Sequence, residues 1–208
     1  MFSGIVKAVG IVEELKSTSG ILNIKISCNA GLREINIGDS VAVNGCCQTV
    51  VKKDRDSFIV QATQETLEKT NLKFLTVGSK VNLEPSLKLS ESLDGHLVSG
   101  HVDFTGEICE ILNDGENRIV AISFPKDYQK YIASKGSITV NGVSLTVIEV
   151  KDVRGGSASA LTITLIPYTR DNTNLGLIKI GDPVNLEVDL VSRYVVNYLE
   201  NARCNVGV

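Results

Sequence analysis

The sequence lacks several features that would point to a common class of function. Its 21 Lys and Arg are scattered rather than clustered and its net charge is −3, so a nucleic-acid partner is not expected. No apolar run approaches the roughly 18 residues of a membrane-spanning helix. Lys7 interrupts the apolar start, which we interpret as a strand rather than a signal sequence. No phosphate-binding glycine loop, Ser-His-Asp order or paired-carboxylate pattern stands out.

The histidines and cysteines of the chain do not show the spacing of a metal site or of a disulfide-rich protein. The two histidines, His96 and His101, are five positions apart, so on one strand they would lie on opposite faces. The cysteines are odd in number and include no CxxC pair, so we expect no structural zinc site. A reducing compartment, the cytoplasm, is the simplest location. The five are Cys28, Cys46, Cys47, Cys109 and Cys204.

What the sequence does contain is an internal repeat. Four pairs of segments match in one order along the chain, and the offset between the copies reaches 103 residues after starting at 96 to 97. The second copy therefore carries about six extra residues, which fit the Gly/Ser-rich loop 154–160. The matched pairs are 2–6 with 98–102, 40–51 with 137–148, 65–72 with 168–175, and 78–84 with 181–187.

Each copy is expected to form a small, closed β-barrel. Alternating apolar and polar residues, many of them β-branched, predict about six strands per copy. The pairs Asn44-Gly45 and Asn141-Gly142 mark tight turns between strands. Closure would remove the exposed edges that so many strands present. We place the first domain at residues 1–96, the second at 97–188 and a C-terminal segment at 189–208.

The C-terminal segment is the one clear helix in the pattern. Over 189–202, apolar residues recur at three- and four-residue spacing, so a helix with one apolar stripe is predicted. A helix this short is marginal alone and needs a partner, either its own barrel or the same helix in other subunits. The stripe consists of Val191, Tyr194, Val195, Tyr198 and Leu199.

The duplication predicts two related pockets, and the positions where the copies differ are the informative ones. Cys47 in the first copy becomes Ser144 in the second, and Ile5 becomes His101. Shared threonine hydroxyls and strand backbone suit hydrogen bonding to a flat polar heterocycle. Each residue also has a structural interpretation: Ser144 and Thr146 as ordinary strand residues, Cys47 as a small buried hydrophobe, His101 as a turn residue and Asp189 as a helix N-cap.

The combined motifs MFSGIV, NGCCQTV, GHLVSGHVD, NGVSLTV, YTRDNTNLG and VNLEVD closely resemble riboflavin synthase over almost the entire chain. The resemblance implies two six-stranded Greek-key barrels and a C-terminal helix that holds a homotrimer together. It implies that two molecules of 6,7-dimethyl-8-ribityllumazine react, one giving a four-carbon unit to the other. The products would be riboflavin and 5-amino-6-ribitylaminouracil, with no metal and no added cofactor.

The resemblance also implies the residues of two unequal pockets at a subunit boundary. The catalytic set would be His101, Ser144, Thr146, Cys47, Asp189 and Phe2, with His101 and Ser144 handling the proton of the 7-methyl group. Lys135 would reach a ligand across the boundary. The first pocket would use Gly4, Ile5, Val6, Cys47, Gln48, Thr49, Gln61, Ala62, Thr63, Gln64, Glu65 and Thr66. The second would use Gly100, His101, Val102, Ser144, Leu145, Thr146, Thr164, Leu165, Ile166, Pro167, Tyr168 and Thr169.

Two alternatives remain beside the enzyme. Ser3, Gln48, Asp94 and Tyr168 depart from the common family pattern, and lumazine-binding fluorescent proteins of the same fold bind lumazine or flavin without turnover. A duplicated barrel could also serve as an assembly or carrier module with no heterocycle ligand.

Overall fold

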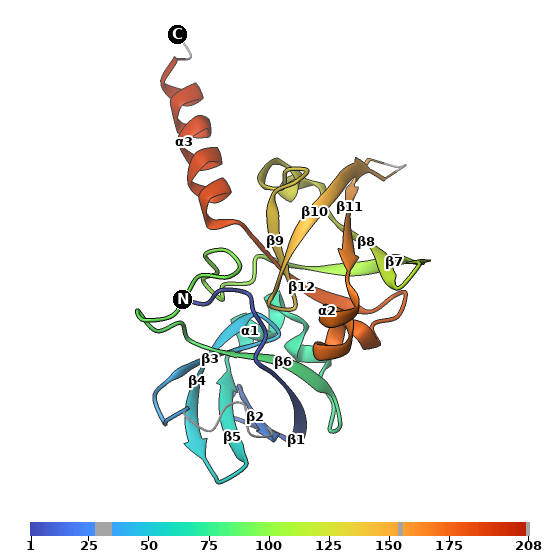
Figure 1. The fold of residues 1–208 in the computed structure, drawn as a ribbon. Helices are drawn as coiled ribbons and strands as arrows, with labels where there is room; N and C mark the ends of the chain where they lie inside the picture. Colours follow the sequence, from blue (N-terminus) through green and yellow to red (C-terminus); the bar gives the residue numbers. More distant parts are fainter. Residues whose placement is uncertain (28–34, 154–155, 207–208) are drawn as a thin grey trace.

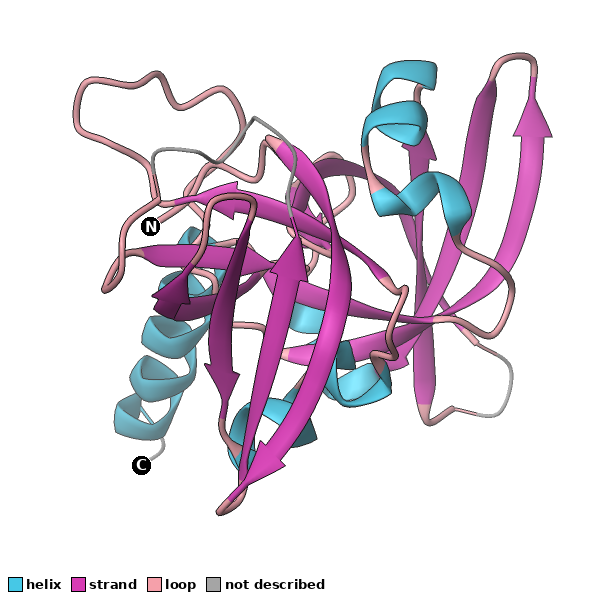
Figure 2. Ribbon diagram, turned by 90° about the horizontal axis from the view of Figure 1, so that it is seen from below, coloured by secondary structure: helices cyan, strands magenta, loops and turns pink. Residues whose placement is uncertain are grey.

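The computed structural model describes residues 1–27, 35–153 and 156–206, and it consists of two closed β-barrels followed by one helix (Figures 1 and 2). The first barrel has the strand order β1-β2-β5-β4-β3-β6, and all its pairs are antiparallel. Because β2 pairs with β5 rather than with β3, the connections follow a Greek-key path. Its strands are β1 (Ala8–Thr18), β2 (Ile21–Ser27), β3 (Ser40–Val43), β4 (Cys46–Lys53), β5 (Ser57–Ala62) and β6 (Lys80–Pro85).

The second barrel repeats this topology as β7-β8-β11-β10-β9-β12, which confirms the two six-stranded barrels predicted from the repeat. Each barrel has its own apolar core, as inward-facing positions alternate along the strands. The predicted boundary between residues 96 and 97 lies in the segment that joins β6 to β7. The strands are β7 (Phe104–Asp114), β8 (Asn117–Pro125), β9 (Ser137–Val140), β10 (Val143–Asp152), β11 (Ala158–Leu165) and β12 (Pro183–Val188).

Short helical pieces complete each copy. They are α1 (Gln64–Lys69), η2 (Asn71–Phe74), η3 (Lys126–Tyr131), α2 (Pro167–Asn172) and η4 (Asn174–Leu177). The six extra residues of the second copy are not confined to the loop 154–160, as the sequence suggested. β10 and β11 are each two residues longer than β4 and β5, so most of the insertion extends a hairpin. Residues 154–155 lie outside the described part of the chain.

The two barrels meet at their equivalent Asn-Gly turns. Asn44 and Asn141 both have φ +47°, and the glycines that follow have φ +76° and +77°, as a two-residue hairpin turn requires. A Cβ on Gly45 would lie 2.6 Å from the backbone nitrogen of Gly142, so neither turn tolerates a larger residue there. Glycine at this position therefore allows the two barrels to approach each other.

Around these turns, six buried asparagines form a reciprocal hydrogen-bond network between the barrels. Asn71 Nδ2 donates to Asn141 Oδ1 at 3.0 Å, and the equivalent Asn174 Nδ2 donates to Asn44 Oδ1 at 2.9 Å. The backbone N–H groups of Asn71 and Asn174 donate in the same crossed manner to the side chains of Asn185 and Asn82. Since each bond has its counterpart in the other copy, the network fixes one relative orientation of the barrels. The six are Asn44, Asn71, Asn82, Asn141, Asn174 and Asn185.

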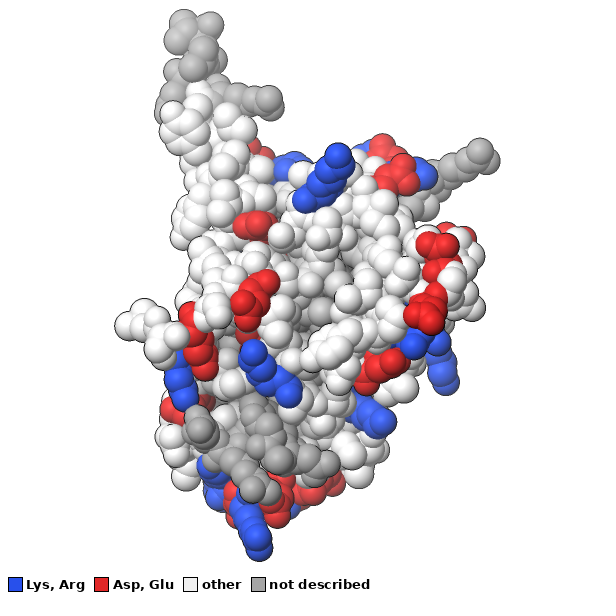
Figure 3. Space-filling view, viewed as in Figure 1, with Lys and Arg blue, Asp and Glu red and all other residues white. Residues whose placement is uncertain are grey.

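Helix α3 (Leu190–Val206) projects from the second barrel (Figure 1). An ion pair of 2.8 Å between Arg193 and Asp103 and another between Lys130 and Glu200 attach it to the barrel. The predicted apolar stripe is exposed, each of its five residues to 50% or more, and the helix surface in Figure 3 is largely uncharged. Among the described residues, none of the helices combines the length and apolar character that a membrane span requires.

Candidate functional site

Two short N-terminal segments, residues 3–6 and 99–102, build the region where the candidate residues gather. The buried carboxylate of Glu84 accepts hydrogen bonds from the backbone and hydroxyl of Ser3 at 2.7 and 2.8 Å and from the Gly4 N–H at 3.1 Å. Glu187 holds Ser99 and Gly100 in the same way. Burial raises the pKa of Glu84, and the three donors oppose that rise because they stabilise the carboxylate.

Each segment also contacts the barrel of the other copy. The Ser144 N–H donates to the Gly4 carbonyl at 2.7 Å, and the Cys47 N–H donates to the Gly100 carbonyl at 2.8 Å. Both glycines have positive φ, and a Cβ on either would lie 2.7 Å from the Cβ of Ser144 or Cys47, respectively. Glycine is therefore required for the close approach of each segment to the opposite barrel.

The structure places these segments differently from the grouping that the repeat predicts. We expected residues 4–6 in the pocket of the first barrel, but they lie beside Ser144, and Val6 packs against the second core. Residues 100–102 lie beside Cys47, and Val102 packs against the first core. Each candidate pocket therefore combines one barrel with the N-terminal segment of the other copy.

Ser144 has a partner that the sequence analysis did not propose. His96 Nδ1 lies 2.8 Å from Ser144 Oγ, and both side chains are half-buried. Burial lowers the pKa of His96 below its ordinary 6.5, and the Asp189 carboxylate partly opposes the shift. A neutral imidazole at neutral pH can accept a proton from the hydroxyl, so the pair has the composition of a general base.

The sequence gives His96 no catalytic role, and its spacing from His101 argues against a metal site, because a histidine in a polar linker carries no local signal. A Cβ on the preceding Gly95 would lie 2.0 Å from the Ser3 carbonyl oxygen and 3.0 Å from Ser144, so glycine is needed to bring the linker against the site. The one sequence feature that could have identified His96 is the pair Gly95-His96 after a polar linker. Within the described residues, no group of three or more His, Cys, Asp or Glu is arranged to hold a metal ion.

His101 and Asp189, both expected in the catalytic set, occupy different places. His101 is exposed in the segment beside Cys47 rather than next to Ser144, and its N–H donates to Ser99 Oγ at 3.3 Å. Asp189 Oδ1 accepts from the Val191 N–H at 2.8 Å, so it caps helix α3 while it influences His96.

The first pocket centres on Cys47, whose side chain is half-buried and packs against the fully buried Phe2. Phe2 has no exposed surface, so its connection with this pocket is its packing against Cys47. The neighbouring Cys46 points into the barrel, and burial raises the pKa of its thiol to about 12. Cys46 therefore stays protonated at neutral pH, whereas Cys47 is the accessible thiol.

Gln48 is the least expected side chain in this region. It points into the first barrel with only 5% exposure, where the second barrel has Leu145. Its Nε2 donates to the Cys47 carbonyl at 2.7 Å and to the Cys46 Sγ at 3.2 Å. Its buried Oε1 has no hydrogen-bond partner among the described residues, which carries a desolvation cost.

The remaining candidate residues fall into two classes. The side chains of Gln48, Ala62 and Leu165 point into the barrels, so only their backbone is available to a ligand. Thr49 and Thr146 point outward on β4 and β10, and residues 61–66 and 164–169 occupy the strand-to-helix junctions beside them. Tyr168 is 75% exposed. Lys135 lies in a turn with φ +65°, where its N–H donates at 2.7 Å to the carbonyl of Val147, the residue after Thr146 on β10.

Comparison with known proteins bears on this geometry. The model of the lumazine binding domain matches the chain twice, over residues 3–86 and 99–189. Riboflavin synthase of Bacillus subtilis is 38% identical over 205 residues, which cover 99% of this chain and 93% of the relative. That of Mycobacterium tuberculosis is 39% identical over 203 residues, covering 97% and 100%, and that of Photobacterium phosphoreum is 37% identical over 200 residues, covering 96% and 89%.

The chain belongs to the riboflavin synthase family.

Solved structures place the same fold around a heterocycle. LumP complexed with riboflavin matches with a TM-score of 0.81 at 28% identity, covering 90% of this chain and 99% of LumP. LumP complexed with 6,7-dimethyl-8-(1'-D-ribityl) lumazine matches with a TM-score of 0.78 and the same coverage. The duplicated barrels of this riboflavin synthase family member are thus shared with a lumazine-binding protein.

Proposed function

We propose that this protein converts two molecules of 6,7-dimethyl-8-ribityllumazine into riboflavin and 5-amino-6-ribitylaminouracil. The two products contain all the atoms of the two substrates, so the transfer of the four-carbon unit needs no oxidant or reductant. Full-length similarity to riboflavin synthases of several bacteria supports the reaction. The reaction needs one lumazine that gives the four-carbon unit and one that receives it, and two pockets with unlike polar groups suit these two roles.

The observation that carries the mechanism is the hydrogen bond between His96 and Ser144. The reaction requires a carbon nucleophile, formed when the 7-methyl group of one lumazine loses a proton. A neutral His96 can receive that proton through the Ser144 hydroxyl, and Thr146 on the same face of β10 can orient the ring. The conjugated ring makes the methyl proton acidic, so positioning and anion stabilisation supply most of the catalysis.

The first pocket would hold the second lumazine, whose ring is attacked. Cys47 presents an accessible thiol there, and Phe2 and the Gly100 carbonyl fix its position. His101 lies on the segment beside Cys47, so we assign it to this pocket. The two pockets would face each other across a subunit boundary, and Lys135 would reach across that boundary to a bound ligand.

We also propose a homotrimer in the cytoplasm. The exposed apolar stripe on α3 supports self-association, since a monomer would leave five large side chains in water. Mass measurement in solution, with and without residues 189–208, tests this. A trimer that becomes monomeric on truncation is expected, and an unchanged mass would contradict the role of the helix.

A second candidate is heterocycle binding without turnover, which the LumP structures favour. Incubation with the lumazine alone separates the two. Formation of one riboflavin per two lumazines, followed by absorbance and fluorescence, is the expected result. Bound lumazine without product would support the binding protein, and no spectral change would contradict both.

A further inference from the structure

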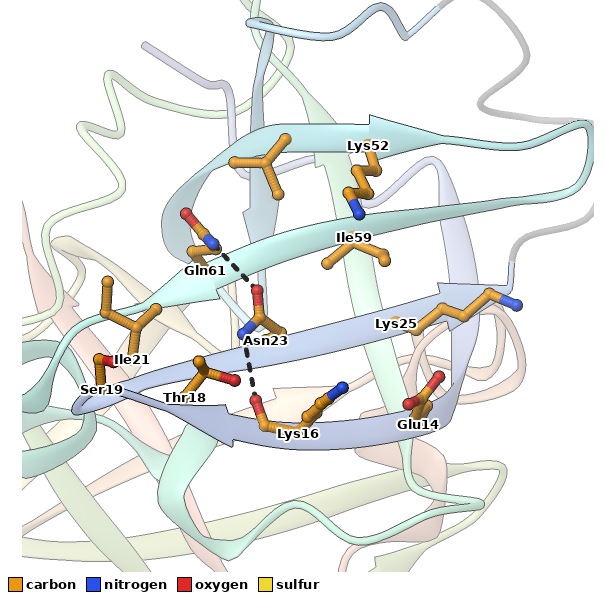
Figure 4. Close-up of a pocket in the computed structure, with 11 residues that line it drawn as sticks. Glu14, Lys16, Thr18, Ser19, Ile21, Asn23, Lys25, Lys52, Ile59 and Gln61 are labelled. Carbon is orange, nitrogen blue, oxygen red and sulfur yellow. Dashed lines mark hydrogen bonds between the residues drawn. The ribbon is translucent and has the colours of Figure 1, made fainter.

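The outer face of the first barrel carries a groove that none of the candidate catalytic residues occupies. Its volume is about 590 Å³, and strands β1, β2, β4 and β5 form its walls (Figure 4). Ile21, Val51 and Ile59 supply the apolar part of its lining. Lys16 on β1 and Lys52 on β4 extend from the two outer strands of the four (Figure 4). The groove therefore combines apolar surface with cationic groups.

The described residues leave part of the charge of this groove without a counter-ion. Lys25 pairs with Glu13 at 3.0 Å, but within the described ranges neither Lys16 nor Lys52 has an ion-pair partner. Glu14 is the one carboxylate in the lining. The groove thus has a net positive charge and two ammonium groups able to bind an anion.

The groove shares one residue with the candidate first pocket. Gln61, which we assign to the first pocket, also lines the groove, where its Nε2 donates to Asn23 Oδ1 at 2.9 Å (Figure 4). Val50 pairs with Val60, so the outward-facing Thr49 and Gln61 lie beside each other on adjacent strands. A ligand above Thr49 can therefore extend over Gln61 into the groove.

The second copy does not reproduce this charge. At the equivalent strand positions, Leu112 replaces Lys16, Ala121 replaces Lys25 and Glu149 replaces Lys52. The register supports the last match, since Lys52 pairs with Ile59 after a bulge and Glu149 pairs with Thr162 after the same bulge. Repetition of the fold alone therefore does not account for the lysines.

We propose that the groove is an anion subsite of the first barrel, which accepts a phosphate ester carried on the ribityl chain of the bound heterocycle. The proposal rests on the proposed function for the location of the ring. Lys16 and Lys52 contact the phosphate as point charges, and the apolar floor contacts the chain that links it to the ring. The first barrel then prefers a phosphorylated flavin to riboflavin.

Fluorescence titration at low ionic strength with riboflavin and with riboflavin 5'-phosphate tests this preference. The full chain should bind the phosphate ester about fivefold to tenfold more tightly, because each lysine–phosphate contact at a surface is worth a modest free energy. In the double variant Lys16→Gln/Lys52→Gln, the two affinities should become equal, with riboflavin binding unchanged. Lys179→Gln, an exposed lysine outside the groove, should retain the preference.

Equal affinities in the unaltered protein, or a preference that persists in the double variant, would overturn the proposal. If the protein binds neither flavin, the proposed function fails. The anion subsite is then tested separately by titration with inorganic pyrophosphate alone. Pyrophosphate should shift the lysine side-chain NMR signals of Lys16 and Lys52, and absence of that shift would refute the subsite separately.

Discussion

Ser144 Oγ lies 2.8 Å from His96 Nδ1, although 48 residues separate them in the chain. Removing either group should slow the chemical step more than it weakens binding. We expect Ser144→Ala or His96→Gln to lower kcat by about a hundredfold with little change in KM, as loss of a positioned base does. Steady-state kinetics measure both constants. Ser123→Ala removes an exposed strand hydroxyl elsewhere and should leave both unchanged. Equal losses in kcat and affinity would contradict the role of the pair.

The pH dependence should show an acid limb that belongs to His96. Burial lowers the pKa of His96 below 6.5, so the imidazole stays neutral at neutral pH and becomes protonated only as the pH falls through that lowered value. We expect kcat/KM to fall below pH 6.5 and the limb to disappear in His96→Gln. The free energy of unfolding should depend on pH in the same direction. The contribution of neutral His96 is complete above pH 6.5 and is lost as the pH falls through the lowered pKa of the folded state. A limb above 6.5 would assign the base to another group.

Glycine substitutions separate backbone strain from steric contact. Gly100 and Gly20 both have φ +79°, but a Cβ on Gly100 would lie 2.7 Å from Cys47 Cβ, whereas Gly20 has no heavy atom within 4 Å. Gly20→Ala should cost about 1 kcal/mol through strain alone. Gly100→Ala should cost at least ~2 kcal/mol more, because Cys47 and its strand must move. Thermal unfolding of both variants measures the difference, and equal costs would mean that the segment does not press on β4.

Much of the fold could be predicted from the sequence because each barrel is specified locally. Alternating β-branched residues and the Asn44-Gly45 and Asn141-Gly142 turns predict strands and hairpins, and the repeat gives the second barrel from the first. The length of the β10–β11 hairpin was misjudged, because residues after a strand can either extend it or form a loop, and composition does not decide between them.

The site was only partly predictable because it depends on contacts between the copies. The approach of Gly4 to Ser144 and of Gly100 to Cys47 joins segments far apart in the chain, so neither hydrogen bond leaves a periodic pattern. Alignment of the copies placed each segment with its own barrel, whereas folding places it with the other. His96 was missed for the same reason.

Because the asparagine network joins the two barrels, we expect the barrels to unfold together in one transition. Asn71→Ala would remove the amide that donates to Asn141 Oδ1 and to the Pro183 carbonyl. It would also remove the oxygen that accepts from the buried Asn44 Nδ2, so the change should cost about 2 kcal/mol. Asn201→Ala, which removes an exposed amide on α3, should cost far less. Calorimetry should show the single unfolding transition broadening or splitting in Asn71→Ala alone. An unchanged profile would mean that the network does not couple the barrels.

Gln48 should lower the stability of the first barrel. Gln48→Leu removes a buried oxygen that has no partner, so we expect the free energy of unfolding to rise by about 1 kcal/mol. The reverse change at the equivalent position, Leu145→Gln, should lower it by ~1 kcal/mol, since it places an amide against the apolar core on which the half-buried Leu145 packs. Denaturant unfolding of both variants checks the pair. A loss of stability in Gln48→Leu would show that the bond from Gln48 to the Cys47 carbonyl outweighs the unpaired oxygen.

The proposed function requires that one chain offer two heterocycle sites, one on each barrel. Equilibrium dialysis of the slow variant Ser144→Ala with 6,7-dimethyl-8-ribityllumazine counts them directly, because the ligand remains unconverted on the protein. Two lumazines bound per polypeptide at saturation is the result that we predict. Saturation at a single lumazine per polypeptide would contradict the proposed function.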